Sequence, residues 1–84
     1  MKSKILVLTT QSGDWEGLFI DGELISEGHN LGQGNSKKFW IDMSKKYDFL
    51  SEDIVEKELT DEDEEYMEDS GNFPNNISEL KGEY

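Results

Sequence analysis

The stretch WEGLFIDGELISE, residues 15–27, contains two apolar runs separated by the pair Asp21-Gly22. An Asp-Gly pair between apolar runs is the strongest short-range signal for a β-hairpin, because a type I′ turn needs positive φ at both central positions. We therefore predict one strand from Trp15 to Asp21 and a returning strand from Glu23 to Glu27.

A two-residue loop also predicts which residues of the hairpin face each other. The expected pairs, counted from the turn, are Ile20–Glu23, Phe19–Leu24, Leu18–Ile25 and Glu16–Glu27. The last pair places two like charges opposite each other, which is mildly unfavourable.

Both faces of this hairpin are expected to be apolar. One face would carry Trp15, Phe19 and Leu24, and the other would carry Leu18, Ile20 and Ile25. One face could therefore cover the core while the other meets a helix or a second subunit.

The segments on either side of the hairpin predict one more strand and one helix. Lys4–Thr10 is rich in β-branched and aliphatic residues, which indicates a strand buried on both sides. Asn35 or Ser36 is a good N-cap for a helix that runs to about Lys46 or Tyr47. An apolar stripe on this helix should face the core, and it consists of Phe39, Trp40, Met43 and Tyr47. Half of the eight lysines lie on the helix, where they could screen the acidic part of the chain.

Residues 28–35, between the hairpin and the helix, form a loop with three glycines. Such a loop ahead of a helix could cradle an anion through its backbone N–H groups. The glycine spacing matches neither the P-loop nor the dinucleotide-binding pattern, and a flexible connection is the plainer interpretation. If a small anionic ligand binds here, we expect it at His29, Gly32 and Gly34.

Residues 52–69 are strongly acidic. Their eleven carboxylates and one lysine contribute −10 of the formal net charge of −12. Residues 54–60 alternate apolar and charged side chains as an edge strand does, although they could also line one side of a helix; we predict a strand. Thr60 would then cap an acidic helix that ends at Ser70-Gly71.

The remaining residues, 70–84, are expected to form a turn, one short helical turn over Ile77–Leu80 and a tail that could fray. The whole chain, residues 1–84, is therefore predicted to be a single α+β domain. It would contain a small antiparallel sheet of three or four strands, one helix packed on a face, and an acidic C-terminal strand and helix.

Several classes of protein are disfavoured by the composition. The chain has no cysteine, so it has no disulfide framework and no thiolate zinc site, which fits the cytoplasm. The first apolar run is too short for a signal peptide or a membrane span. An EF-hand beginning at Asp61 fails, because Tyr66 stands where glycine is required. No serine or histidine lies in a catalytic motif, so we expect no enzyme activity, no metal and no cofactor.

The charge instead favours a basic partner protein, because the field of the chain repels nucleic acids and anionic membranes. Carboxylates three or four residues apart on a helix lie about 5–6 Å apart at Cβ and can roughly imitate a phosphate backbone. We expect a non-enzymatic inhibitor of a nucleic-acid-binding factor that acts by DNA or RNA mimicry. Small acidic phage proteins that block host factors are similar in size and charge alone. The expected partner-binding residues are Glu56, Glu58, Asp61, Asp63, Glu64, Glu65, Tyr66, Glu68 and Asp69.

Two other functions remain open from the sequence. The chain could be a dimeric protein–protein adaptor that uses an apolar face of the 15–27 hairpin, or it could bind a small anionic ligand through the 28–35 loop. Salt separates the first alternative from mimicry, because a charged interface weakens as salt rises and an apolar interface does not.

Overall fold

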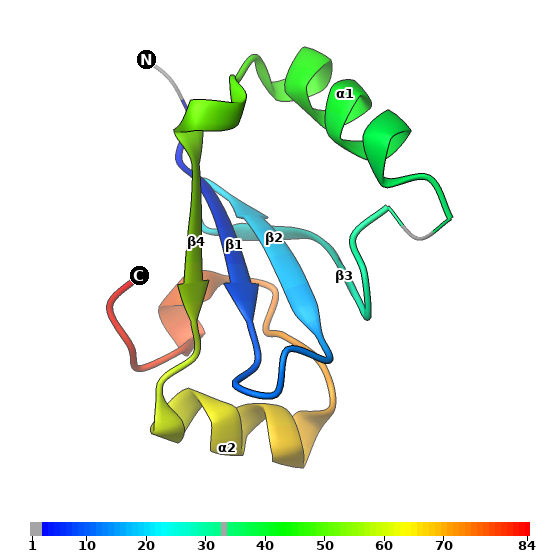
Figure 1. Ribbon diagram of the computed structural model, residues 1–84. Helices are drawn as coiled ribbons and strands as arrows, with labels where there is room; N and C mark the ends of the chain where they lie inside the picture. The colour runs from blue at the N-terminus through cyan, green and yellow to red at the C-terminus, as the bar shows by residue number, and fades with distance from the viewer. Residues whose placement is uncertain (1–2, 33) are drawn as a thin grey trace.

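The computed structural model describes residues 3–32 and 34–84 as a sheet with helices at its faces and at one end (Figure 1). In chain order the elements are β1 (Ile5–Thr9), β2 (Glu16–Ile20), β3 (Glu23–Gly28), α1 (Ser36–Tyr47), the 3-10 helix η1 (Ser51–Asp53), β4 (Ile54–Glu58), α2 (Asp61–Ser70) and the 3-10 helix η2 (Ile77–Glu79). The predicted order of strands and helices is confirmed, and so is the α+β class. Residues 54–58 are a strand rather than a helix.

The strands form one sheet in the spatial order β3-β2-β1-β4. β2 is antiparallel to both β1 and β3, but β4 is parallel to β1, so the sheet is mixed rather than wholly antiparallel as predicted. The reason is that α1 carries the chain from the end of β3 back to the other end of the sheet. The next strand must then run in the same direction as β3, and parallel strands need a long crossover connection of this kind.

The hairpin turn has the predicted conformation, since Asp21 and Gly22 both have positive φ, 52° and 87°. Its register follows the prediction only next to the turn, where the pairs are Ile20–Glu23 and Phe19–Leu24. A β-bulge then makes Ile25 the extra residue on β3 and gives the pairs Leu18–Ser26, Gly17–Glu27 and Glu16–Gly28. The bulge avoids the pair of like charges that an uninterrupted register would have produced.

One face of the sheet packs against α1. The buried residues of this cluster are Ile5, Val7, Leu18, Ile20, Leu31 and Phe49. The predicted stripe on α1 covers them, because Phe39, Trp40, Met43 and Tyr47 are partly buried against the cluster. The helix begins after the predicted N-cap, where the Asn35 side chain accepts a hydrogen bond from the Lys38 N–H.

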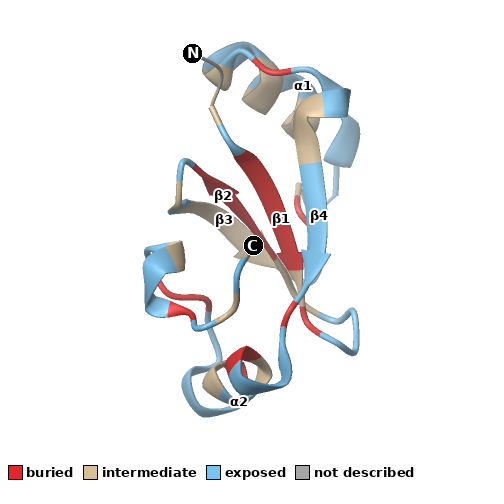
Figure 2. Ribbon diagram, turned by 90° about the vertical axis from the view of Figure 1, so that its left-hand side faces the viewer, coloured by how far each residue is buried: buried red, intermediate tan, exposed pale blue. Residues whose placement is uncertain are grey.

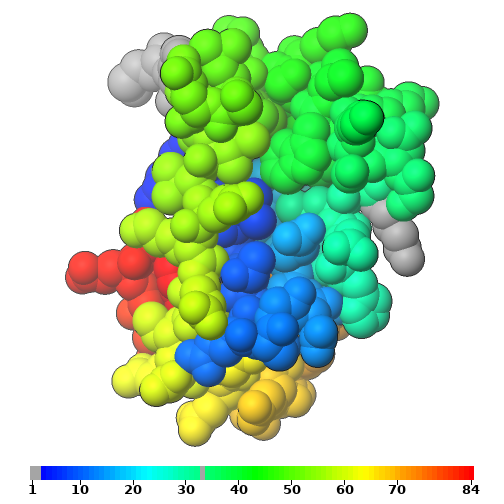
Figure 3. Space-filling model, viewed as in Figure 1, coloured from blue at the N-terminus to red at the C-terminus, as the bar shows by residue number. Residues whose placement is uncertain are grey.

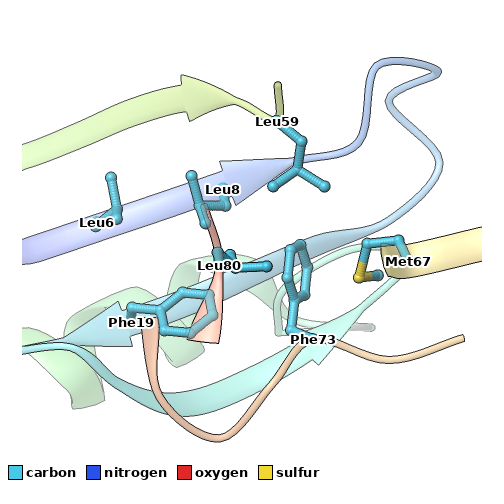
Figure 4. Close-up of a cluster of buried hydrophobic side chains, with 7 residues drawn as sticks. All are labelled: Leu6, Leu8, Phe19, Leu59, Met67, Phe73 and Leu80. Carbon is cyan, nitrogen blue, oxygen red and sulfur yellow. The ribbon is translucent and has the colours of Figure 1, made fainter. Parts of the chain in front are cut away.

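The opposite face is covered by the C-terminal part of the chain, and α2 lies across the end of the sheet (Figures 1 and 2). The buried residues of this second cluster are Leu6, Leu8, Phe19, Leu59, Met67, Phe73 and Leu80 (Figure 4). Phe73 stacks edge-on against Phe19, with ring centroids 5.6 Å apart. It also lies against Gly17, where any side chain would collide with the Phe73 ring.

The segment after α2 lies against the sheet and is hydrogen-bonded to β3. The Leu24 N–H donates to the Asn75 carbonyl at 2.9 Å, and the Ile77 N–H donates to the Gly22 carbonyl at 2.8 Å. These bonds cover the outer edge of β3 beside the hairpin turn. The two faces of the hairpin are covered by different parts of the chain: α1 packs on one face and the C-terminal segment packs on the other.

Candidate functional site: the acidic helix

The ends of α2 are fixed by the residues that the sequence predicts. The Thr60 hydroxyl accepts a hydrogen bond from the Asp63 N–H, and Gly71 closes the helix with φ of 76° and an N–H bond to the Met67 carbonyl. Residues 61–64 are all acidic, and the positive end of the helix dipole stabilises them. The last turn has no basic residue, so the carboxylates there face the negative end of the dipole.

Asp63 and Met67 are buried on the inner side of α2. The Asp63 carboxylate accepts hydrogen bonds from the Lys81 N–H at 2.8 Å, the Gly82 N–H at 2.8 Å and the Tyr84 hydroxyl at 2.5 Å. The prediction that Asp63 contacts a partner is therefore wrong, because its oxygens are used to hold the C-terminal segment against the helix.

The hydrogen bond between Asp63 and Tyr84 also affects the pKa of both side chains. Burial alone would raise the pKa of Asp63, but the Tyr84 hydroxyl and the two backbone N–H groups favour the carboxylate and together lower the pKa below its ordinary value. Burial and the adjacent carboxylate raise the pKa of Tyr84, so the hydroxyl stays protonated and keeps donating. Tyr66, the predicted apolar anchor, is half-buried against the same core cluster and lies beside the inner face.

The outer side of α2 carries every other carboxylate of the helix. We call this set the acidic face: Asp61, Glu62, Glu64, Glu65, Glu68 and Asp69. Five of the six are exposed and Glu64 is half-buried. The sequence predicted all of them as contact residues except Glu62. Its spacing of three and seven residues from Glu65 and Asp69 places it on the same side and could have identified it.

Two members of the acidic face are oriented by the loop between β1 and β2. The Gln11 side chain donates to the Asp61 carboxylate at 2.7 Å and to the Leu59 carbonyl at 3.2 Å. The Gln11 backbone N–H donates to the Glu64 carboxylate at 3.0 Å. The first turn of α2 is thereby joined to the sheet as well as to the C-terminal segment.

Glu56 and Glu58 extend the negative surface onto the edge strand β4, where both are exposed. They share one side of the strand, because side chains two residues apart point the same way. β4 leads directly into α2, so the strand that carries these two carboxylates ends beside the start of the acidic helix (Figure 1).

The lysines of α1 do not screen the acidic face, contrary to the expectation from the sequence. α1 and α2 lie at opposite ends of the molecule, as the green and the yellow-to-orange side chains show in Figure 3. Among the described residues, an ion pair joins Lys81 to Glu62 at 3.9 Å with both side chains largely exposed. An exposed pair of this kind adds little stability and leaves the charge of the face accessible to a partner.

The predicted ligand loop is occupied by contacts within the protein. His29 Nδ1 lies 2.9 Å from the Asp14 carbonyl, and its ring stacks edge-on against Trp15. The Leu31 N–H, one of the amides that could have bound an anion, donates to the Glu16 carboxylate at 2.8 Å.

Gly32 of this loop lines an open hollow, but it also packs directly against α1. Gly32 has φ of 69° and lies so near the Phe39 side chain that a Cβ could not fit. Two open hollows of about 390 and 440 Å³ flank the loop, and Gly32 lines both. Gly34 lines the larger hollow, whereas His29 lines neither, so the three predicted ligand residues do not converge on one site.

Comparison with protein-family models, with curated proteins and with solved structures finds no match to this chain. In the part of the chain that the structure describes, no cluster of three or more histidine, aspartate or glutamate side chains is arranged to hold a metal ion. Within those same residues, no helix has both the length and the apolar character needed to cross a membrane.

Proposed function

We propose that this chain is a non-enzymatic acidic protein that binds a basic partner protein through the acidic face of α2. Glu56 and Glu58 of β4 extend the contact. The partner would use a groove lined with lysine or arginine, and the protein would inhibit it by competing with nucleic acid for that groove.

The observation that supports this proposal most strongly is that the acidic face is held in one shape. α2 is capped at both ends, anchored by Met67 and Asp63 on its inner side, and joined to the sheet through Gln11. A disordered acidic tail would lose conformational entropy on binding, and a helix already in place avoids most of that cost.

The charge density of α2 also resembles that of a nucleic acid. A ten-residue helix is about 15 Å long, so the six outer carboxylates give about one charge per 2.5 Å. Double-stranded DNA carries one charge per roughly 1.7 Å of axis, or one per 3.4 Å for each strand. A groove that binds one strand of a duplex would therefore meet a comparable density of negative charge.

The experiment is affinity capture from a cell lysate with three baits: the unaltered protein, a face variant and a control variant. The face variant is Glu65→Gln/Glu68→Gln/Asp69→Asn. The control is Glu23→Gln/Asp42→Asn/Glu52→Gln, which removes the same charge from exposed positions outside α2. Circular dichroism establishes that all three baits are folded.

We expect the unaltered protein and the control to capture the same nucleic-acid-binding protein at low salt, and the face variant to lose it. Raising the salt, or adding duplex DNA or RNA, should release the captured protein. Capture that depends equally on both sets of carboxylates would contradict the proposal, as would a partner that nucleic acid does not displace.

A further inference from the structure

A small hollow opens between α2 and the loop that joins β1 to β2, which lie against each other (Figure 1). Its volume is about 210 Å³. Pockets that hold drug-sized molecules measure roughly 300–1,000 Å³, so this hollow suits a single side chain better than a separate small molecule. It is open to solvent beside Gly71, where a Cβ would meet nothing within 4 Å.

The hollow combines apolar and acidic walls. Trp15 and Met67 line it, and both belong to the core cluster on this side of the sheet or pack against it. Three acidic residues also line it: Asp14 from the loop, and Glu64 and Glu68 from α2. None of the described residues that line the hollow is basic. Its charge and its apolar surface together favour a cation with a hydrocarbon stem.

The walls are held in place by contacts within the protein. The Trp15 indole N–H donates to the Glu27 carboxylate at 2.9 Å, and the indole ring packs edge-on against His29 with centroids 4.9 Å apart. The Gln11 backbone N–H fixes the Glu64 carboxylate from the other side at 3.0 Å. A side chain that enters the hollow therefore meets walls that are already ordered, which lowers the entropic cost of binding.

Two of the three carboxylates keep their full capacity to accept hydrogen bonds. Within the residues that the structure describes, the Asp14 and Glu68 carboxylates accept no hydrogen bond and form no ion pair, and both residues are exposed. Glu68 lies four residues after Glu64, so the helix places these two side by side. A cation in the hollow would thus be shared by carboxylates from two different elements.

We propose that this hollow binds one arginine side chain of the basic partner. The aliphatic part of the arginine would lie on Trp15 and Met67, and its guanidinium would lie among the three carboxylates. Arginine fits better than lysine, because a planar guanidinium donates to a carboxylate through two parallel N–H groups and also stacks on indole rings. This inference rests on the proposed function, since the arginine belongs to the partner proposed there.

The test is an NMR titration of the ¹⁵N-labelled protein with three short peptides. Each peptide has blocked ends and glycines around one central residue, which is arginine, lysine or citrulline; citrulline has the shape of arginine without its charge. Salt at about 0.15 M screens the long-range attraction of the acidic chain for any cation. We expect the arginine peptide to shift the Trp15 indole signal and the Asp14 and Glu68 amides until they saturate. The Trp40 indole, at the other end of the molecule, should stay in place.

Two variants of α2 provide a matched comparison. Glu68→Gln and Glu65→Gln remove the same charge from exposed positions of one helix, but Glu68 lines the hollow and Glu65 does not. Glu68→Gln should weaken binding of the arginine peptide by roughly two- to fivefold, which is typical of losing one exposed ion pair, and Glu65→Gln should have little effect. Asp14→Asn should weaken binding as Glu68→Gln does, because the site draws on both elements.

Three outcomes would overturn the proposal: no saturable shift with the arginine peptide, equal or tighter binding of the lysine or citrulline peptide, and equal weakening by Glu68→Gln and Glu65→Gln. The last would show that the peptide responds to the charge of the whole helix. Because the titration contains no partner protein, any of these results would leave the proposed function standing. An arginine response without capture of a partner from the lysate would instead contradict the proposed function and leave the arginine site in place.

Discussion

At the scale of single residues, Asp63 is 2% exposed and accepts hydrogen bonds from three groups in the last four residues of the chain. Asparagine at this position would present an amide group to donors that need an acceptor. Asp63→Asn should therefore lower the free energy of unfolding by about 2–4 kcal/mol at neutral pH. Asp42→Asn, at an exposed position on α1, is the control and should change it by less than about 0.5 kcal/mol.

The Asp63 carboxylate also makes the free energy of unfolding depend on pH. Because the pKa of Asp63 is lowered in the folded protein, the unfolded chain binds more protons below its ordinary pKa of about 4. The stabilisation is thus fully present above about pH 4 and is lost as the pH falls through the lowered value. Urea unfolding across this pH range measures the free energy of unfolding of the unaltered protein and of Asp63→Asn. The difference between the two values should become smaller as the pH falls. A difference that stays constant down to pH 2 would show that the ionised carboxylate contributes nothing.

Gly17 provides a test of the core on the opposite side of the sheet from α1. A Cβ there would lie 2.6 Å from the Phe73 ring, so Gly17→Ala must displace the ring and should cost about 1–3 kcal/mol. Gly28, in the paired strand, has its nearest such neighbour at 4.0 Å, so Gly28→Ala should cost little. Thermal unfolding of the two variants measures the contrast, and equal costs would mean that Phe73 does not pack on β2.

At the scale of elements, α2 holds negative charge where it is unfavourable for the helix itself. Glu68 and Asp69 lie in or beside the last turn, at the negative end of the dipole, with no basic residue there. Asp69→Asn should therefore raise the free energy of unfolding by about 0.3–1 kcal/mol, and Asp61→Asn, at the favourable end, should lower it. Urea unfolding at low salt measures the change in the free energy of unfolding for each variant and so tests whether the two changes have opposite sign. A destabilising Asp69→Asn would show that the residue serves the fold rather than the surface.

The hairpin and both helices could be predicted from the sequence because the signals for them lie in neighbouring residues. The Asp21-Gly22 turn and the caps Asn35, Thr60 and Gly71 depend on neighbouring residues, and the structure confirms all of them. The bulge at Ile25 and the parallel pairing of β4 depend on segments far apart in the chain, and local pattern did not reveal them.

The error at Asp63 was partly avoidable. Asp63 lies three and four residues before Tyr66 and Met67, so helix periodicity places it on the apolar side of α2. Its main partner, Tyr84, is 21 residues away, and no pattern in the sequence connects the two.

At the scale of the whole molecule, negative charge is concentrated at one end. α2, which carries the acidic face, lies at one end of the sheet, and α1, which carries four of the eight lysines, lies at the other (Figure 3). The C-terminal segment links the sheet to α2, because it packs on one face of the sheet, pairs with β3 and holds α2 through Asp63. The fold therefore separates the most acidic surface of the molecule from the helix that holds half of its lysines.

The central claim is that the acidic face belongs to a fixed helix rather than to a mobile tail. Amide hydrogen exchange measured by NMR tests it most directly, since the backbone N–H groups of α2 are protected only while the helix is formed. We expect the amides of residues 65–70 to exchange at rates close to those of β1 and far below those of an unstructured peptide. Exchange of these amides at the rate of an unstructured chain, while β1 stays protected, would contradict the account.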